Sequence, residues 1–390
     1  MQVSQYSCNV TRCTRRLSPG RRQFTSYYRM AVPKGVVKFD STKMPQFVGH
    51  CSSRNMMRTN EDRYRLGFMN LPISGHTQQV FTAGIFDGHG GPQCAEFLQK
   101  NLGEFVEDAD IEELRQTILQ RFKDRFGGYW RSARVLNSSA LRSYERSVYD
   151  DLAVRLPLAY LSADYQQLQL DQMSGSTCTC AYLYTIDPEA QFWNPGVDSN
   201  LVVAQVGDTR ALICDNEGNV AQLTTVHHAD TPMESDRLRP FKHAMHVTSD
   251  GMLRLLQYVN TRAFGDYQGK AMGIIAVPEL TSYRIGSHRE RLPGKEAFVV
   301  MVTDGVTDLA SDQEICDIVI QRGIQGGSLR GTPQDAANEI LSYVSMLGTR
   351  DNATALVIRL GAWGEWSNWQ DRTGKIREDR LDWCSQRRET

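Results

Sequence analysis

The stretch QVFTAGIFDGHGG, residues 79–91, joins an apolar run to a turn rich in glycine. Its first eight residues are mostly apolar or β-branched, which predicts a buried β-strand. The last five residues place Asp87 and His89 among three glycines, and a backbone without side chains can approach a bound group closely. Glycine, an acid and a histidine do not fill a core, so the stretch predicts a functional turn at a strand end.

Acids border apolar strands at other places in the chain. Asp304 follows the run AFVVMVT, Asp351 lies just before ATALVIRL, and RTNEDRY carries Glu61 and Asp62. One such acid is ordinarily a turn former, but several suggest convergence, because clustered carboxylates repel one another unless a cation neutralises them. An all-oxygen ligand set favours Mg²⁺ or Mn²⁺ over Zn²⁺.

The remaining patterns predict a mixed α and β domain. Further runs predict strands: residues 176–186, 201–208, 210–215, 297–304 and 353–360. Residues 91–106 and 111–122 have helical periodicity, Ser311 with Glu314 forms a capping box, and Thr332 before a proline begins another helix. Strands interrupted by amphipathic helices predict packed sheets with helices outside, and the absence of a linker predicts one domain over residues 47–360.

Seven motifs, in this order, resemble the metal-dependent serine/threonine protein phosphatases of the type-2C class: RTNEDRY, FDGHGG, SGST, VGDTRA, TRAFGD, VTDGVTD and TRDNAT. The resemblance covers about residues 47–360. It implies an α+β fold, a central β-sandwich of two antiparallel sheets flanked by helices on both sides. It also implies hydrolysis of phosphoserine and phosphothreonine in phosphoproteins by direct attack of a hydroxide that bridges two Mg²⁺ or Mn²⁺ ions.

The resemblance implies a role for each matching residue. The metal ligands are Asp62, Asp87, Gly88, Asp304 and Asp351. Three further residues hold water, bind phosphate and donate a proton, namely Glu61, Arg58 and His89. Asp308 matches a ligand of a third ion, but Gln172 stands where relatives have another aspartate for that ion, so two ions are expected.

Several residues near these motifs are expected to be structural. Asp208 in VGDTRA and Asp266 in TRAFGD are acids in tight turns. His227 and His228 follow Val226, which replaces an acid of the family pattern, and are expected on the surface without a metal. Residues 103–155 match no motif and are expected to form an inserted helical region.

Two other functions share much of this pattern. A pseudophosphatase would keep the fold and bind a partner without activity, but the complete set of acids, with Arg58 and His89, argues against it. A metal-dependent hydrolase of small phosphate esters is the second alternative. Comparing the turnover of a phosphopeptide and a phosphate ester separates it from a protein phosphatase.

The ends of the chain differ from the domain. Residues 1–39 contain eight basic residues, no acid and many hydroxyl residues, which is typical of a mitochondrial transit peptide, and RRQFTSYY predicts cleavage after Phe24. We therefore expect a mitochondrial matrix enzyme, with the pyruvate dehydrogenase complex as a candidate substrate, because some mitochondrial members of the family act on it. A disordered basic tail on a cytosolic protein is the alternative. Residues 361–390 hold four of six tryptophans, which either pack on the domain or dock a protein partner.

Composition limits the remaining classes. The 44 Lys and Arg residues nearly balance the 45 Asp and Glu residues, so the overall charge does not indicate nucleic-acid binding. The sequence contains no run of about 18 apolar residues, so it predicts no membrane-spanning helix. The nine cysteines include no C-x-x-C pair, which favours buried free thiols in a reducing compartment.

Overall fold

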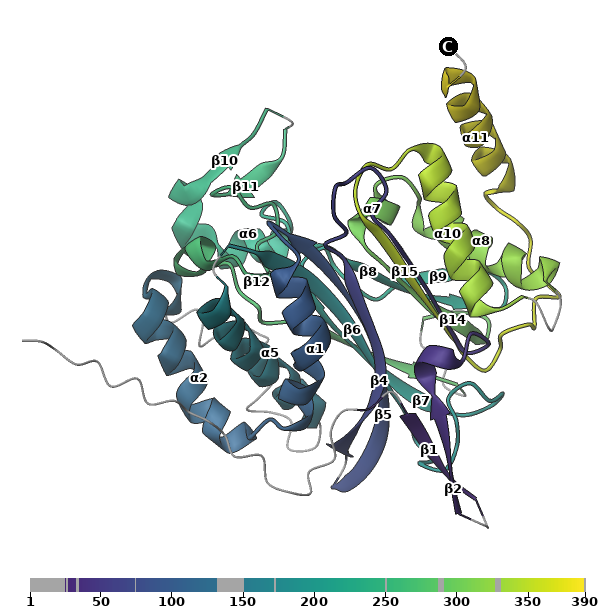
Figure 1. The fold of residues 1–390 in the computed structure, drawn as a ribbon, viewed down its shortest axis with the longest axis horizontal. Coiled ribbons are helices and arrows are strands. Elements are labelled where there is room, and N and C mark those ends of the chain that lie inside the picture. Colours follow the sequence, from purple (N-terminus) through teal and green to yellow (C-terminus); the bar gives the residue numbers. More distant parts are fainter. Residues whose placement is uncertain are drawn as a thin grey trace, which may run out of the picture.

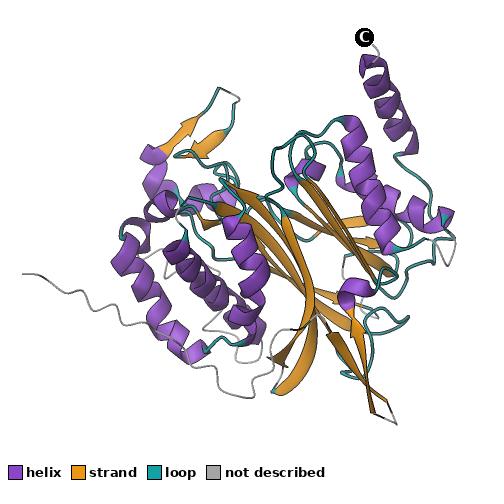
Figure 2. Cartoon of the chain, in the orientation of Figure 1, coloured by secondary structure: helices purple, strands orange, loops and turns teal. Residues whose placement is uncertain are grey.

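Two antiparallel sheets form the centre of the computed structural model, which describes residues 25–388 except 26, 33, 34, 74, 132–150, 172, 250, 287–290 and 327–330. The first sheet has the order β13 (Glu279–Ile285), β7 (Ser199–Val206), β6 (Gly175–Thr185), β5 (His76–His89) and β4 (Arg63–Ile73), with β12 (Phe264–Gly265) beside β6. The second has the order β3 (Val48–Ser53), β15 (Ala353–Arg359), β14 (Glu296–Val302), β8 (Arg210–Asp215) and β9 (Val220–Gln222). The predicted sandwich is confirmed (Figures 1 and 2).

Helices cover the outer face of each sheet (Figure 1). α1 (Gln93–Glu107), α2 (Ile111–Phe126) and α5 (Asp151–Leu170) lie on one side, and α8 (Asp312–Gln325) and α10 (Pro333–Leu347) lie on the other. The predicted capping box of α8 is present, and Thr332 caps α10. In the region 103–155, the described residues are largely helical, while residues 132–150 lie outside the described part.

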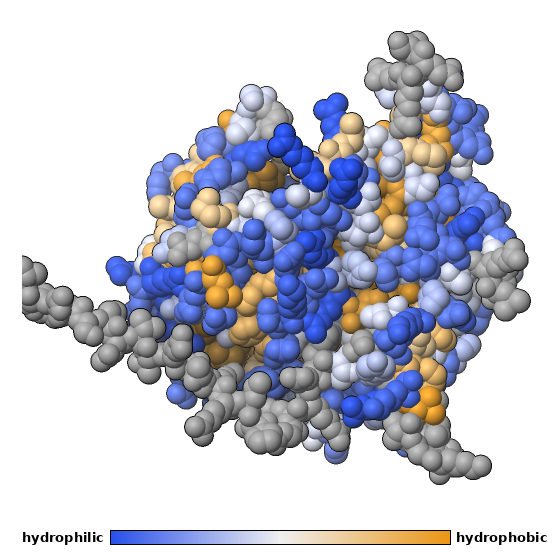
Figure 3. Space-filling view, viewed as in Figure 1, coloured by the Kyte–Doolittle hydropathy of each residue, from blue (hydrophilic) through white to orange (hydrophobic). Residues whose placement is uncertain are grey.

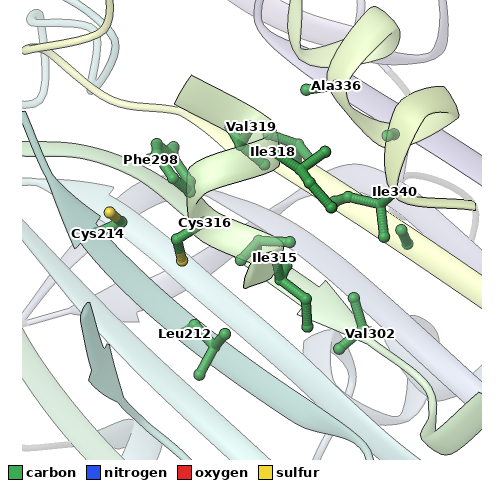
Figure 4. Packing of buried hydrophobic residues seen from close by; sticks show 14 of the residues in the cluster. Leu212, Cys214, Phe298, Val302, Ile315, Cys316, Ile318, Val319, Ala336 and Ile340 are labelled. Atoms are coloured by element: carbon green, nitrogen blue, oxygen red, sulfur yellow. The ribbon is translucent and has the colours of Figure 1, made fainter. Parts of the chain in front are cut away.

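Both faces of each sheet are apolar because both are covered. In β14, Val299 and Met301 face the space between the sheets, while Phe298 and Val300 face the helices. Figure 4 shows the face of the second sheet that the helices cover, where Ile315 and Val319 of α8 project toward the strands. Each such buried side chain contributes about 1.5–3 kcal/mol. The seven described cysteines are all free, and five are buried, as predicted.

The first described strands begin before residue 39. β1 (Tyr27–Val32) pairs with β2 (Gly35–Asp40), and Thr25 exchanges two backbone hydrogen bonds with Phe68 of β4. The 3-10 helix η1 (Ser41–Lys43) then leads into β3. Of the segment predicted to be a transit peptide, only residues 1–24 precede the first described strand pairing.

The tryptophan-rich end packs against the second sheet's helices. Trp366 is 8% exposed, and the Trp369 indole donates a hydrogen bond to Asp317 of α8 at 3.3 Å. α11 (Gly374–Arg388) is tied to α8 by the Arg380–Glu314 ion pair at 2.8 Å. Trp383 is 55% exposed, and a protein partner for it stays a prediction. None of the described helices has the length and apolarity needed to cross a bilayer.

A compact segment of short elements lies between β9 and β13. It contains α6 (Pro232–Arg237), η3 (Arg239–Ala244), the hairpin of β10 (Met245–Val247) and β11 (Leu253–Leu255), and η4 (Tyr267–Met272). Glu234 of α6 is fully buried and pairs with Arg237 at 2.5 Å and Arg262 at 2.8 Å. Burial raises the pKa of Glu234, but the two arginines outweigh it and hold the pKa well below its ordinary value. This network therefore contributes to the free energy of unfolding at pH values above about 4.3, the pKa of a glutamate in the unfolded chain. The contribution is lost as the pH falls below that value.

Candidate active site

A cleft of about 710 Å³ contains most of the residues predicted from the motifs. The predicted residues that line it are Glu61, Asp87, Gly88, His89, Asp304, Asp308 and Asp351. Asp62 is buried, at 3% exposed, and Arg58 is exposed next to Met57, which lines the cleft. Figure 3 shows hydrophilic residues gathered at this end of the molecule, between the β10–β11 hairpin and the helices of the second sheet.

The strand ends of both sheets bring the acids together. Asp87 lies near the end of β5, Asp304 begins the short helix α7 (Asp304–Thr307) directly after β14, and Asp351 lies just before β15. Carboxylate oxygens of Asp87, Asp208 and Asp304 lie within 4.8 Å of one another. β5 and β14 belong to different sheets, so the cluster exists only because the sheets pack face to face.

Glycine is required where two backbones approach beside the cluster. A Cβ atom on Gly88 would lie 2.6 Å from the carbonyl oxygen of Glu61, far inside van der Waals contact. The Glu61 amide donates to the Asn352 side chain at 2.7 Å, and the Glu61 carboxylate accepts from the Gly91 amide at 3.0 Å. The loop that carries Glu61 is therefore held against turns from both sheets.

The carboxylates of Asp62, Asp87 and Asp304 are poorly compensated by positive charge. Burial, followed by the charges of neighbouring acids, raises the pKa of Asp87 well above its ordinary value. Burial and the charges of Asp208 and Asp351 raise the pKa of Asp304 to about 7. Burial raises the pKa of Asp62 to about 6, although hydrogen bonds from two threonines oppose this shift. Buried acids that are difficult to ionise together are the groups that a divalent cation stabilises.

The donor set fits hard cations such as Mg²⁺ or Mn²⁺. Asp62 accepts hydrogen bonds from Thr354 at 2.7 Å and Thr303 at 3.0 Å through one oxygen only. Its other oxygen, Oδ1, is buried and has no hydrogen-bond partner among the described residues, and the same holds for Asp208 Oδ1. Unpartnered buried oxygens in a cluster of carboxylates are suitable ligands for an oxygen-seeking ion.

His89 is held by an acid that is distant in sequence. Its Nε2 atom donates to Asp266, with distances of 2.9 and 3.0 Å to the two carboxylate oxygens. Burial lowers the pKa of His89, but the hydrogen bond and the negative charges of Asp266 and Asp208 outweigh it, so the pKa is raised. Asp266, the turn acid of TRAFGD, therefore contacts the predicted catalytic residue His89. The position of Asp266 in the sequence did not reveal this contact.

Two further residues of the cleft were missed by sequence reasoning. Asp208 joins the acid cluster, and the strand LVVAQVG before it carries the same strand-end signal that singled out Asp304. His228 lines the cleft and lies 3.2 Å from Asp208. The expected surface position is wrong for His227, whereas His228 is partly exposed in the cleft. His227 is fully buried, where Nδ1 accepts from the Gly207 amide at 3.0 Å and Nε2 pairs with Glu279.

The residues that match the third-ion site of relatives are only partly described. Asp308 lines the cleft, whereas Gln172 lies outside the described part of the chain. The neighbouring Asp171 accepts hydrogen bonds from the amides of Met173 and Ser174 at 3.0 and 3.1 Å. The Asp171 carboxylate therefore stabilises a local turn.

Known proteins resemble this chain in sequence and fold. Residues 35–353 match the family model of protein phosphatase 2C. Protein phosphatase 2C homolog 4 of Schizosaccharomyces pombe is 35% identical over 355 residues, 88% of this chain and 87% of that protein. The mitochondrial protein phosphatase 1K of Xenopus laevis is 28% identical over 321 residues, 82% of this chain and 69% of that protein. A phosphatase structure from Toxoplasma gondii, 14% identical, shares the fold with a TM-score of 0.58, covering 86% of this chain and 94% of that one.

Proposed function

The chain belongs to the protein phosphatase 2C family and is a serine/threonine protein phosphatase, and from this premise we propose that the acid cluster around Asp87 is its catalytic centre. Phosphatases of this family depend on Mg²⁺ or Mn²⁺. In our proposal two ions are held by the side chains of Asp62, Asp87, Asp304 and Asp351 and by the Gly88 carbonyl, with Asp208 adding negative charge. When bound, the ions activate a water molecule and offset the charge of the phosphate.

The other residues of the cleft act on the substrate. Arg58, exposed next to the cleft-lining Met57, forks onto two phosphate oxygens and orients the phosphorus atom. Glu61, fixed by the Gly91 amide, orients the attacking water. His89, whose protonated form Asp266 favours, donates a proton to the leaving serine or threonine oxygen.

Direct hydrolysis without a phosphoenzyme is supported by the lining of the cleft. No cysteine or serine is found among the described residues that line it, so a phosphocysteine or phosphoserine intermediate has no nucleophile there. Asp308 also lines the cleft, and we propose that it binds a third ion only weakly, because Gln172 replaces an acid.

The close approach of the carboxylates of Asp87, Asp208 and Asp304 is the observation that carries this proposal, and chelation tests it. Protein beginning at Thr25 should release phosphate from phosphoserine or phosphothreonine peptides with Mg²⁺ or Mn²⁺, and should lose this activity when both are chelated. Activity that survives exhaustive chelation contradicts the metal centre. Phosphopeptide binding without release indicates the pseudophosphatase, and turnover of nitrophenyl phosphate alone indicates a hydrolase of small esters.

We further propose a mitochondrial location, with matrix phosphoproteins such as the pyruvate dehydrogenase complex as substrates. The acid-free basic segment 1–24 supports it, as does the similarity to a mitochondrial relative. A reporter fused to residues 1–39 should enter mitochondria and be cleaved near Thr25. Replacing Arg15, Arg16, Arg21 and Arg22 by glutamine is the control and should leave the reporter in the cytosol. A diffuse signal from the unmodified fusion would instead favour a basic tail without a targeting role.

A further inference from the structure

A buried ion pair behind the catalytic cleft has no part in the mechanism proposed above. Asp164 of α5 and Lys270 of η4 are both fully buried, and the Lys270 Nζ atom lies 2.7 Å from an oxygen of the Asp164 carboxylate. Neither residue is among the described residues that line the cleft. Lysine and aspartate are almost never fully buried, and a buried pair is weak evidence for a gain in stability, because taking both charges out of water is costly. The pair therefore indicates a role other than stability.

Both side chains of the pair bind the backbone of the segment that leads to Asp266. The Asp164 carboxylate accepts a hydrogen bond from the Gly265 amide at 2.8 Å, and Lys270 Nζ donates to the carbonyl oxygen of Ala263 at 2.9 Å. α5, which carries Asp164, packs against β12, the short strand that ends at Gly265 (Figure 1). The ion pair therefore fixes the backbone directly before Asp266.

The backbone at Asp266 has a conformation that is uncommon for residues other than glycine. Asp266 has φ 52° and ψ 51°, in the left-handed region, and Gly265 before it has φ 71°. A side-chain-bearing residue keeps such a conformation where the surrounding structure holds it in place. A shift of this turn would move the Asp266 carboxylate, whose oxygens lie 2.9 and 3.0 Å from His89 Nε2.

Strand register places His89 beside the same turn. Gly175 of β6 is paired with His89 of β5 on one side and with Gly265 of β12 on the other. A Cβ atom on Gly175 would lie 2.3 Å from His89 Nε2 and 2.5 Å from Asp266 Oδ1, so the two side chains meet over a residue that has none. The geometry of the contact between His89 and Asp266 therefore depends on where the Gly265 backbone lies.

We propose, on the basis of the proposed function, that the buried pair of Asp164 and Lys270 positions Asp266, and through it the ring of His89, for proton donation to the leaving oxygen. Lys270 holds the Asp164 carboxylate in place, and the hydrogen bond from the Gly265 amide transmits that position to the turn. Asp164 and Lys270 are positioning residues, since they act through Asp266 and not on the substrate. Losing the bond to Gly265 displaces the His89 ring and slows the step that needs its proton.

Two double variants that remove both charges test the proposal. Asp164→Leu/Lys270→Met removes the acceptor for the Gly265 amide, whereas Asp164→Asn/Lys270→Met keeps a carbonyl oxygen there. The first should lower kcat for a phosphothreonine peptide by about 10–100-fold and lower nitrophenyl phosphate turnover much less, since nitrophenolate leaves without a proton. The second should restore most of the phosphopeptide kcat. Equal losses with the two substrates, or equal losses in the two variants, overturn the inference.

A combination with His89→Ala shows whether the pair acts through His89. Asp164→Leu/Lys270→Met should cause almost no further loss of phosphopeptide turnover when His89 is already absent, because two changes on one path are not additive. A further loss as large as in the wild-type background overturns the inference, since the effect would then bypass His89.

Arg155→Met is the matched control for a general loss of stability. Arg155 is also buried on α5, but it donates to the carbonyl oxygen of Val106 at 3.0 Å and not to the segment before Asp266. This variant should lower Tm and leave the ratio of the two turnover rates at its wild-type value at temperatures below Tm. A change in that ratio as large as in the Asp164 variant overturns the inference.

Asp164→Glu provides a second variant should Asp164→Leu/Lys270→Met fail to fold. It keeps the charge but moves the carboxylate by one methylene, and it should lower phosphopeptide turnover more than nitrophenyl phosphate turnover. Equal losses in Asp164→Glu overturn the inference but leave the phosphatase activity established. Absence of metal-dependent turnover with every substrate in the wild-type protein overturns the proposed function, and this inference with it.

Discussion

Asp87→Asn is expected to lower kcat/KM by about a thousandfold for phosphopeptides and nitrophenyl phosphate alike. The substitution keeps the shape of the side chain but removes one charge from a cluster in which Asp87, Asp208 and Asp304 lie within 4.8 Å. Metal ions supply several kcal/mol of transition-state stabilisation, and losing about 4 kcal/mol corresponds to a thousandfold decrease in rate. The loss should be equal for both substrates because both need the cations.

Thermal unfolding provides a measurement of Asp87→Asn that does not depend on activity. Mg²⁺ or Mn²⁺ should raise the Tm of the wild-type protein by mass action, and this increase should be much smaller in the variant. Without metal, the variant should be at least as stable as the wild type, because the neighbouring carboxylates repel Asp87. Asp187→Asn, at an exposed turn acid, is the control and should change neither quantity. Normal turnover and a normal metal-induced Tm increase would exclude Asp87 from the centre.

His89→Ala is expected to slow phosphopeptide hydrolysis by about 10²–10⁴, the usual contribution of a general acid. A serine or threonine alkoxide is a poor leaving group and needs a proton, whereas nitrophenolate is already stable as an anion. Nitrophenyl phosphate turnover should therefore fall much less. Equal losses with the two substrates would mean that His89 positions phosphate or water and does not donate the proton.

Asp266→Asn extends this prediction to the residue that holds His89. Asparagine keeps a hydrogen-bond acceptor near His89 Nε2 but removes the charge that favours the protonated ring. We expect a smaller loss than in His89→Ala, with the same selectivity for the phosphopeptide over nitrophenyl phosphate. A loss that is equal for both substrates would indicate that Asp266 only maintains the fold of its turn.

The sequence by itself determined six strands of the sandwich, β5, β6, β7, β8, β14 and β15, and most of the acids of the centre. The runs around β5, β14 and β15 are apolar at nearly every position because both sheet faces are covered. Asp87, Asp304 and Asp351 lie where such runs begin or end, so a local pattern was sufficient to find them. The helix starts at Ser311 and Thr332 were predictable for the same reason, since a cap depends only on residues three positions apart.

Only the tertiary structure decided which turns share the cleft. Asp208 followed the same strand-end pattern, yet its place beside Asp87 depends on the packing of two sheets and has no local signature. The contact of His89 with Asp266 joins residues 177 positions apart. His227 was expected on the surface because no other histidine or cysteine is spaced to bind a metal with it, but Gly207 and Glu279 provide hydrogen-bond partners for its ring in the interior. A sequence pattern reports which residues of one segment are buried. Contacts between distant turns depend instead on strand register and sheet packing, and no single segment encodes these.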